Sequence, residues 1–148
     1  MSFKSDLAKF AQKTIRNNNA IVRKVVIDMG TSLVMKTPVG NPKLWKNPDG
    51  APEGYAGGRA RANWQYGTGS MPDGVVDSID LGGNNTVNKI IGGVQASPAA
   101  SVHWISNNLP YIKRLEDGWS YRQAPQGMLK LTIEEFEQTV RSAVEALK

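Results

Sequence analysis

The feature that most constrains the fold is a long N-terminal segment, from Ser5 to Met35, in which apolar side chains recur every three or four positions. These side chains are Leu7, Ala11, Ile15, Val22, Val25, Met29 and Leu33. Such spacing places one apolar stripe along one face of a helix. We therefore predict one long helix that ends before Pro38, since a residue that precedes proline disfavours helical backbone. A break or bend at Asn17–Asn19 or at Gly30 stays open, because asparagine and glycine are poor helix formers.

The composition predicts one folded domain that covers residues 1–148. With 148 residues, of which 40% are hydrophobic, the chain carries enough apolar surface for a single core. The sequence has no apolar run of about 20 residues and no block pattern of a secretory signal. We therefore expect no membrane association and a protein that is soluble where it is made.

Residues that commonly carry catalysis or bind metals are scarce. The chain has no cysteine, so it forms no disulfide and offers no thiolate ligand or thiol nucleophile. The only histidine, His103, lies between Val102 and Trp104 and is interpreted as a strand residue rather than a metal ligand. Neither a GxxxxGKS/T phosphate loop nor a GxGxxG dinucleotide motif occurs. We expect no metal, no cofactor and no enzymatic activity.

The segment 38–58 is rich in glycine and proline and is predicted to be an extended loop. Loops of about 20 residues are uncommon inside compact domains unless they bind a partner or are disordered. Trp45 and Tyr55 give this loop two apolar anchors. Two interpretations stay open: an arm that contacts a partner, or a loop that folds back on its own domain through these aromatic side chains.

Two strands and a short helix are predicted in the middle of the chain. Residues 59–68 alternate small or aromatic side chains with polar ones, the period of a half-buried strand, and residues 101–106 form a second strand. Residues 86–91 are expected to form a short helix that stops at Gly92 and Gly93. We interpret the two glycines as residues that form a turn, not as a phosphate-binding site.

A short helix and a marked loop are expected after the second strand. Pro110 is suited to the first position of a helix that covers 111–117. Gly118 is expected to end that helix in the left-handed conformation. In the loop that follows, residues 128–129 add apolar surface, and a short strand there would extend a sheet.

The chain finishes with a predicted helix. Thr132 and Glu135 have the spacing of a capping box at its start. Acidic residues in the opening turns are explained by the positive end of the helix dipole, so they do not indicate a catalytic pair. The apolar stripe of this helix comprises Ile133, Phe136, Val140, Val144 and Leu147.

Four blocks, read in order, form the most distinctive feature of the sequence. They are TPVG at 37–40, GGRARANWQ at 57–65, ISNNLPYIKRLEDGWSYRQAPQGML at 105–129 and LTIEEF at 131–136. Together they cover nearly the whole chain and resemble a family of minor tail or neck proteins of lambda-like long-tailed bacteriophages. The third block is the most specific, because helix and turn propensities do not dictate its order of residues. In that family a short Thr-Pro-Val-Asp-Thr-Gly turn is frequent, whereas here a longer loop follows Val39, so the contacts of this loop do not follow from the resemblance.

The resemblance implies an α+β domain in which a long N-terminal helix and a C-terminal helix pack on a small antiparallel sheet, with long loops. It implies a structural virion protein of the tail and neck, present in the host cytoplasm during assembly, that acts in tail completion and head-to-tail joining. The implied partners are further copies of the chain, which form a ring around the DNA passage. The expected number of subunits in this ring is six. Neighbouring tail-terminator, tail-tube or head-connector proteins complete the list. No catalytic residue carries over, since the role of the family is structural.

The two loops supply the candidate contacts of such a ring. Trp119 follows a helix-ending glycine, and its indole must be buried either in its own domain or under a neighbouring subunit. Both alternatives stay open. The interface candidates from the loops 38–58 and 117–129 are Trp45, Tyr55, Trp119, Gln123, Pro125 and Met128.

A basic module that binds or contacts DNA is the alternative function. The formal net charge of +5 and the pI near 9.6 favour contact with a polyanion. The first helix is the most basic segment, although its cations are distributed around it: Lys9, Lys13, Arg16, Arg23 and Lys24. No helix-turn-helix or zinc-finger motif occurs, so we expect any contact with phage DNA to be weak, non-specific and sensitive to salt. A hydrolase has no support beyond the presence of serine, aspartate and glutamate.

Overall fold

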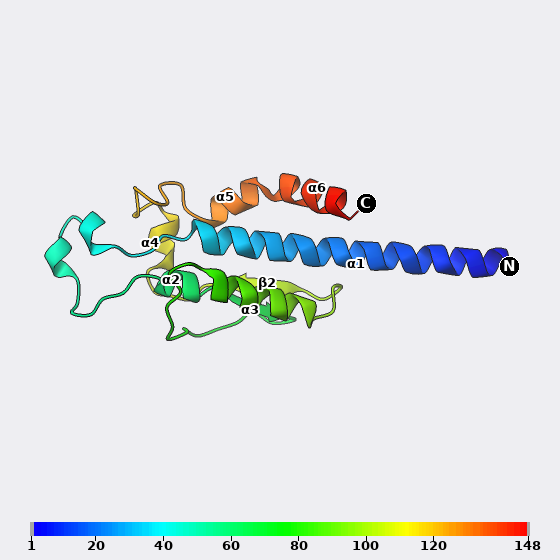
Figure 1. Cartoon of the computed structure of the whole chain (residues 1–148), viewed down its shortest axis with the longest axis horizontal. Helices are drawn as coiled ribbons and strands as arrows, with labels where there is room; N and C mark the ends of the chain where they lie inside the picture. The colour runs from blue at the N-terminus through cyan, green and yellow to red at the C-terminus, as the bar shows by residue number, and fades with distance from the viewer. Residues whose placement is uncertain (1, 148) are drawn as a thin grey trace.

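The computed structural model describes residues 2–147. Its helices and strands are α1 (Phe3–Lys36), η1 (Pro42–Leu44), η2 (Pro48–Gly50), α2 (Arg59–Ala62), β1 (Gln65–Thr68), α3 (Asn84–Gln95), β2 (His103–Ser106), α4 (Ile112–Glu116), α5 (Leu129–Glu134) and α6 (Phe136–Ala146). In Figure 1, α3 and the strands lie on one side of α1, and α5 and α6 lie on the other. The α+β class, the long N-terminal helix, the C-terminal helix and the small antiparallel sheet are thereby confirmed.

α1 is a single unbroken helix, so the predicted helix is confirmed and neither candidate break is present. It ends at Thr37, immediately before Pro38. Gly30 stays helical and lets two neighbours approach closely. A Cβ at this position would lie 3.0 Å from Cγ2 of Ile90 and 3.1 Å from Cδ1 of Ile105. This glycine therefore serves packing and introduces no bend.

The two predicted strands pair antiparallel, and both are shorter than predicted, since β1 begins at Gln65 and β2 at His103. The paired residues are Gln65↔Ser106, Tyr66↔Ile105, Gly67↔Trp104 and Thr68↔His103. Residues 59–62 form the helical turn α2 and not the start of a strand. Gly58 causes this difference, because it adopts the left-handed region (φ +98°) and its carbonyl accepts a hydrogen bond from the N–H of Ala62.

α3 is longer than predicted and runs through Gly92 and Gly93 to Gln95. The prediction that the glycine pair ends this helix is wrong. Gly93 stays helical, and its role is to let the helix pack closely against a neighbouring strand. A Cβ on Gly93 would lie 2.5 Å from Cδ1 of Tyr66. The missing side chain lets α3 lie directly against β1.

The start of α3 is held by Asp80, a residue that is only 8% exposed. Its carboxylate accepts hydrogen bonds from the N–H of Gly83 (2.9 Å) and from the N–H and the hydroxyl of Thr86 (2.8 Å each). Burial works to raise the pKa of Asp80, but the hydrogen bonds from Thr86 and Gly83 and the charge of Arg61 outweigh it, so the pKa lies below its ordinary value. The ionised carboxylate thus supplies the cap of this helix.

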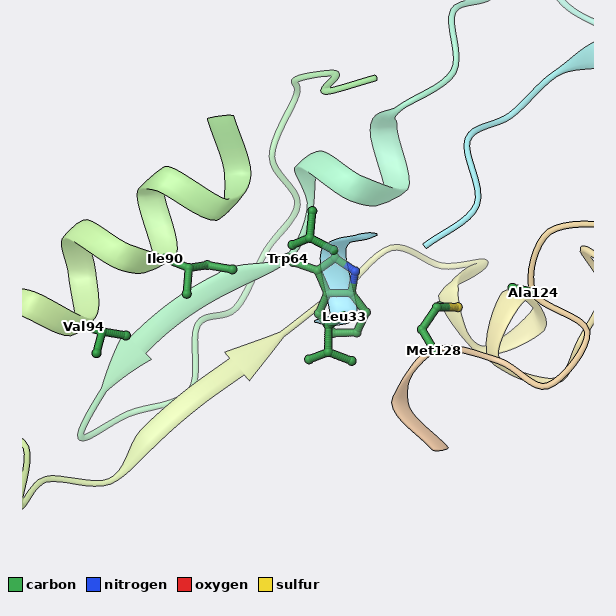
Figure 2. Close-up of a cluster of buried hydrophobic side chains, with 7 residues drawn as sticks. Leu33, Trp64, Ile90, Val94, Ala124 and Met128 are labelled. Carbon is green, nitrogen blue, oxygen red and sulfur yellow. The ribbon is translucent and has the colours of Figure 1, made fainter. Parts of the chain in front are cut away.

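The hydrophobic core includes the C-terminal part of α1, and Figure 2 shows its buried side chains. Its buried members are Leu33, Val34, Trp64, Ile90, Val94, Ala124 and Met128. Trp64 is also tethered by a polar bond, since its Nε1 donates to Oγ1 of Thr37 (2.7 Å). The hydroxyl of Thr37 in turn donates to the carbonyl of Leu33 (2.6 Å). The largest ring of the core is therefore joined directly to the end of α1.

α4 begins at Ile112 rather than at Pro110, and Gly118 follows it in the left-handed region (φ +88°), as predicted. The prediction of a sheet-extending strand at 128–129 is wrong, because α5 begins there. The carboxylate of Glu116 accepts hydrogen bonds from three successive N–H groups, those of residues 128–130, at 2.8–2.9 Å. Glu116 therefore caps α5 from a distant part of the chain.

The capping box predicted at Thr132 and Glu135 is also wrong, since α5 already begins at Leu129. The hydroxyl of Thr132 donates to the carbonyl of Met128 (2.9 Å) within the first turn. Glu135 forms an ion pair with Nζ of Lys36 (2.8 Å). The hydroxyl of Thr132 also lies 3.1 Å from that of Ser32, so both residues attach the C-terminal helices to α1, and their side chains do not form the predicted capping box.

Replacement of Asp80 by asparagine should lower the free energy of unfolding by about 1–3 kcal/mol at pH 7, because the amide lacks the charge that strengthens these hydrogen bonds. The stabilisation by ionised Asp80 is complete above the ordinary aspartate pKa of about 3.9 and is lost as the pH falls through the lower folded-state pKa. Urea unfolding of both proteins should therefore show a smaller difference at about pH 3. A difference of equal size at both pH values would contradict a role for the charge.

Replacement of Glu116 by glutamine should lower the free energy of unfolding by about 1–2 kcal/mol, because a neutral amide is a weaker acceptor for the N-terminal N–H groups of α5. Glu134→Gln, at an exposed position of the same helix, is the matched control and should change stability by less than about 0.5 kcal/mol. Urea titration followed by circular dichroism measures both. Equal stabilities of the two variants would show that Glu116 does not hold this helix.

Candidate functional site

The two loops predicted to make contacts meet at one end of the molecule, away from the N-terminus (Figure 1). The loop that contains η1 and η2 faces the loop between α4 and α5 across a groove of about 1040 Å³. Its aromatic lining residues are Trp45, Tyr55, Tyr111, Trp119 and Tyr121. We call this feature the aromatic groove.

One wall of the aromatic groove is a pair of packed rings in the loop 38–58. Trp45 and Tyr55 meet edge to face, with ring centroids 5.1 Å apart and planes at 66°. Gly40 lies directly beneath the hydroxyl of Tyr55, where a Cβ would have no room. Trp45 is 36% exposed and Tyr55 is 41% exposed. The two rings therefore hold the loop together and still present surface to a partner.

The opposite wall carries Trp119, which is 69% exposed. The alternative in which this indole is buried in its own domain is therefore wrong. The guanidinium of Arg114 lies 4.9 Å from the centroid of the indole, and that of Arg122 lies 5.6 Å from the ring of Tyr121. Such cation–π contacts orient the aromatic rings without covering them.

The side chain of Gln123 joins the two loops at the base of the groove. Its Oε1 accepts a hydrogen bond from the N–H of Val39 (2.9 Å), and its Nε2 donates to the carbonyl of Val39 (2.8 Å). One side chain thereby satisfies both backbone groups of a residue in the other loop. The two walls are thus held at a defined separation.

Arg61 forms the support behind this groove. Its guanidinium donates to the carbonyl oxygens of Thr37 (2.8 Å), Leu81 (2.8 Å) and Met35 (3.2 Å). These bonds connect the C-terminus of α1 with the segment that precedes α3. The loop 38–58 therefore starts from a rigid point.

The groove is cationic as well as aromatic. Lys46, Arg59 and Arg122 are among its lining residues, and within residues 2–147 no carboxylate lines it. Burial raises the pKa of the Tyr111 phenol above its ordinary value; the charge of Arg59 opposes this rise and Tyr55 adds to it. Tyr111 therefore stays a neutral hydrogen-bond donor at neutral pH. This surface suits a partner segment that combines apolar side chains with carboxylates.

Four of the six predicted interface residues come together in this groove: Trp45, Tyr55, Trp119 and Gln123. Pro125 is exposed but lines a small neighbouring hollow instead. The prediction for Met128 is wrong, because its side chain is fully buried in the core of its own chain. A methionine beside a glycine-rich loop fills the space beneath that loop and leaves no surface for a partner.

Five charged or aromatic groove residues were not among the predicted ones: Lys46, Arg59, Tyr111, Tyr121 and Arg122. The local pattern places Arg59 in a strand and Tyr111 on a helix face, and it carries no information about which side of the molecule each one reaches. The sequence did carry a signal for two of these residues, Tyr121 and Arg122. The dipeptide Tyr121–Arg122 lies in the same short loop as Trp119, and an aromatic side chain beside an arginine is typical of interface surfaces.

His103 lies outside the groove and has a structural role, as predicted for a strand histidine. Its Nε2 donates to the carbonyl of Ala99 (3.0 Å), which leaves Nδ1 to accept a hydrogen bond from the hydroxyl of Tyr66 (2.7 Å). Both ring nitrogens are thus engaged by residues in or next to the two-stranded sheet. Within residues 2–147, no cluster of three or more acidic or histidine side chains is arranged to hold a metal ion.

Comparison with known proteins finds no matching family model, no matching curated protein and no matching solved structure. In the part of the chain that the structure describes, no helix combines the length and the apolar character needed to cross a membrane.

Replacement of Gln123 by alanine should loosen the loop 38–58, because it removes both hydrogen bonds to Val39. We expect a stability loss of about 1 kcal/mol and faster hydrogen exchange of amides in that loop. Gln126→Ala, at an exposed position of the same connecting loop, is the matched control. Unchanged exchange in 38–58 after removal of the Gln123 side chain would contradict its role as a tether.

Proposed function

We propose that this chain is a structural virion protein of a long-tailed bacteriophage that acts in tail completion and head-to-tail joining. The proposal includes a ring of copies around the DNA passage and excludes a catalytic role. One observation supports it: the blocks that resemble phage neck proteins supply the residues that frame the aromatic groove and the wall that carries Trp119 and Tyr121, whereas the other wall comes from the loop between the first two blocks. Arg61, Glu116 and Gln123 each bind backbone groups of a different segment.

The chemistry of the groove supports contact with a protein. Exposed tryptophan and tyrosine side chains are rigid, lose little conformational entropy on binding and dominate many interfaces. The neighbouring cations add selectivity for carboxylates. We therefore assign the groove to a segment of an adjacent neck protein that carries acidic and apolar side chains.

DNA contact is the second candidate, and one observation favours it. Because α1 is unbroken, Lys9, Lys13 and Arg16 stand at positions i, i+4 and i+7 of a continuous helix and share one face. Three cations in a row suit a phosphate backbone better than the scattered arrangement expected from the sequence. In a ring around DNA, this contact would accompany the structural role.

The role in joining is tested with phage particles assembled without this chain, which should accumulate as separate heads and tails. Supply of wild-type protein or of Trp119→Phe should restore joining, whereas Trp119→Ala should not, because an interfacial indole typically contributes about 2 kcal/mol or more. The alanine variant should stay folded by circular dichroism, since the side chain is 69% exposed. Normal joining without the chain would overturn the proposed function. Normal joining with Trp119→Ala would show that joining does not depend on the aromatic groove.

A further inference from the structure

The N-terminal part of α1, residues 3–18, projects beyond every other element of the fold (Figure 1). We call it the arm. Its large apolar side chains are unusually exposed: Phe3 81%, Leu7 54%, Phe10 68% and Ile15 58%. Their helical spacing places them on one broad apolar stripe. At 1.5 Å per residue, the arm is about 22 Å long.

A second apolar stripe is exposed on the C-terminal helices. We call it the α6 flank; its exposed members are Ile133, Phe136, Val144 and Leu147, and the half-buried Val140 lies between them. Ile133 is 57% and Phe136 is 47% exposed, whereas Ala143, on the inner face of α6, is fully buried. The flank is about 21 Å long by the same rise per residue, so its length matches that of the arm.

The stripe on the arm continues a surface that already binds a helix. Further along the same face of α1, the hydroxyl groups of Ser32 and Thr132 lie 3.1 Å apart, and Lys36 pairs with Glu135 at 2.8 Å. In the C-terminal half, therefore, α5 and α6 cover this face of α1. Because α1 is straight and unbroken, the arm cannot fold back onto the flank of its own molecule.

Charge determines which surface of a second copy fits the arm. The arm carries four cations and one carboxylate: Lys4, Lys9, Lys13, Arg16 and Asp6. Residues 133–147 carry four carboxylates and one cation: Glu134, Glu135, Glu137, Glu145 and Arg141. Two arms would repel each other, whereas an arm and an α6 flank attract. Charge and length thus favour the same pairing.

We propose that the arm of one copy docks on the α6 flank of the next copy. The contact joins two different surfaces, so it is heterologous and propagates from subunit to subunit until a ring closes. It leaves the aromatic groove free for an adjacent neck protein. The inference rests on the proposed function only for closure into a ring.

The chain has no cysteine, so single introduced thiols test this contact directly. Ala11→Cys lies at the middle of the arm and Val140→Cys at the middle of the flank, which makes the pair independent of helix direction. A mixture of these two variants should form roughly tenfold more disulfide-linked dimer than a mixture of Arg16→Cys with Val140→Cys, because thiols held within bonding reach have a raised effective concentration. Circular dichroism confirms that each variant is folded.

The other outcomes separate this contact from the proposed function. Efficient self-linking of Ala11→Cys alone would mean that two arms pair, and it would overturn the inference. An oligomer by light scattering without the expected cross-link would also overturn it, while the role in joining would stand. Efficient cross-linking of the Ala11 and Val140 positions, combined with normal joining in phage that lack the chain, would support the contact and overturn the function.

Discussion

The rest of the structure depends on how α1 ends inside the protein. The last turn of a helix leaves carbonyl groups without partners, and a buried polar group without a hydrogen bond costs several kcal/mol, on the order of 2–7. Thr37, which is fully buried, binds the carbonyl of Leu33 and the indole of Trp64, while Arg61 binds two further carbonyls of this turn. The helix can therefore stop beside the core, and the loop that starts at Pro38 leaves from a fixed position.

A similar logic explains the order of residues in the block 105–129. Glu116 caps α5, and Gly118 and Gly127 both adopt the left-handed region that returns the chain to it. The approach is close: a Cβ on Gly127 would lie 2.5 Å from the carbonyl oxygen of Glu116. Gln123 projects from the same loop to Val39. Glu116, Gly118 and Gly127 fold the block back on itself, and Gln123 joins it to Val39, which is why local propensity does not account for the pattern.

Burial is unevenly distributed along the molecule. The core occupies the C-terminal half of α1, whereas the arm, the α6 flank and the aromatic groove remain open. Contiguous apolar surfaces of this kind on a folded chain mark sites of interaction. The arm and the aromatic groove carry mainly cations, whereas the α6 flank carries mainly carboxylates, so charge separates the flank from the other two surfaces. The fold thus leaves three apolar surfaces that its own core does not cover.

The sequence by itself determined the elements whose signal is local: α1 from its apolar period, the two strands from their alternation, and the loop 38–58 from its breakers. It also predicted that Trp45, Tyr55 and Trp119 supply contacts to a partner, and the structure leaves all three exposed. Only the tertiary structure decided that Gly93 packs a helix on a strand, that Met128 is buried, and that two distant loops form one groove. The physical reason is that periodicity reports which face of an element is apolar, whereas long-range packing decides what covers that face.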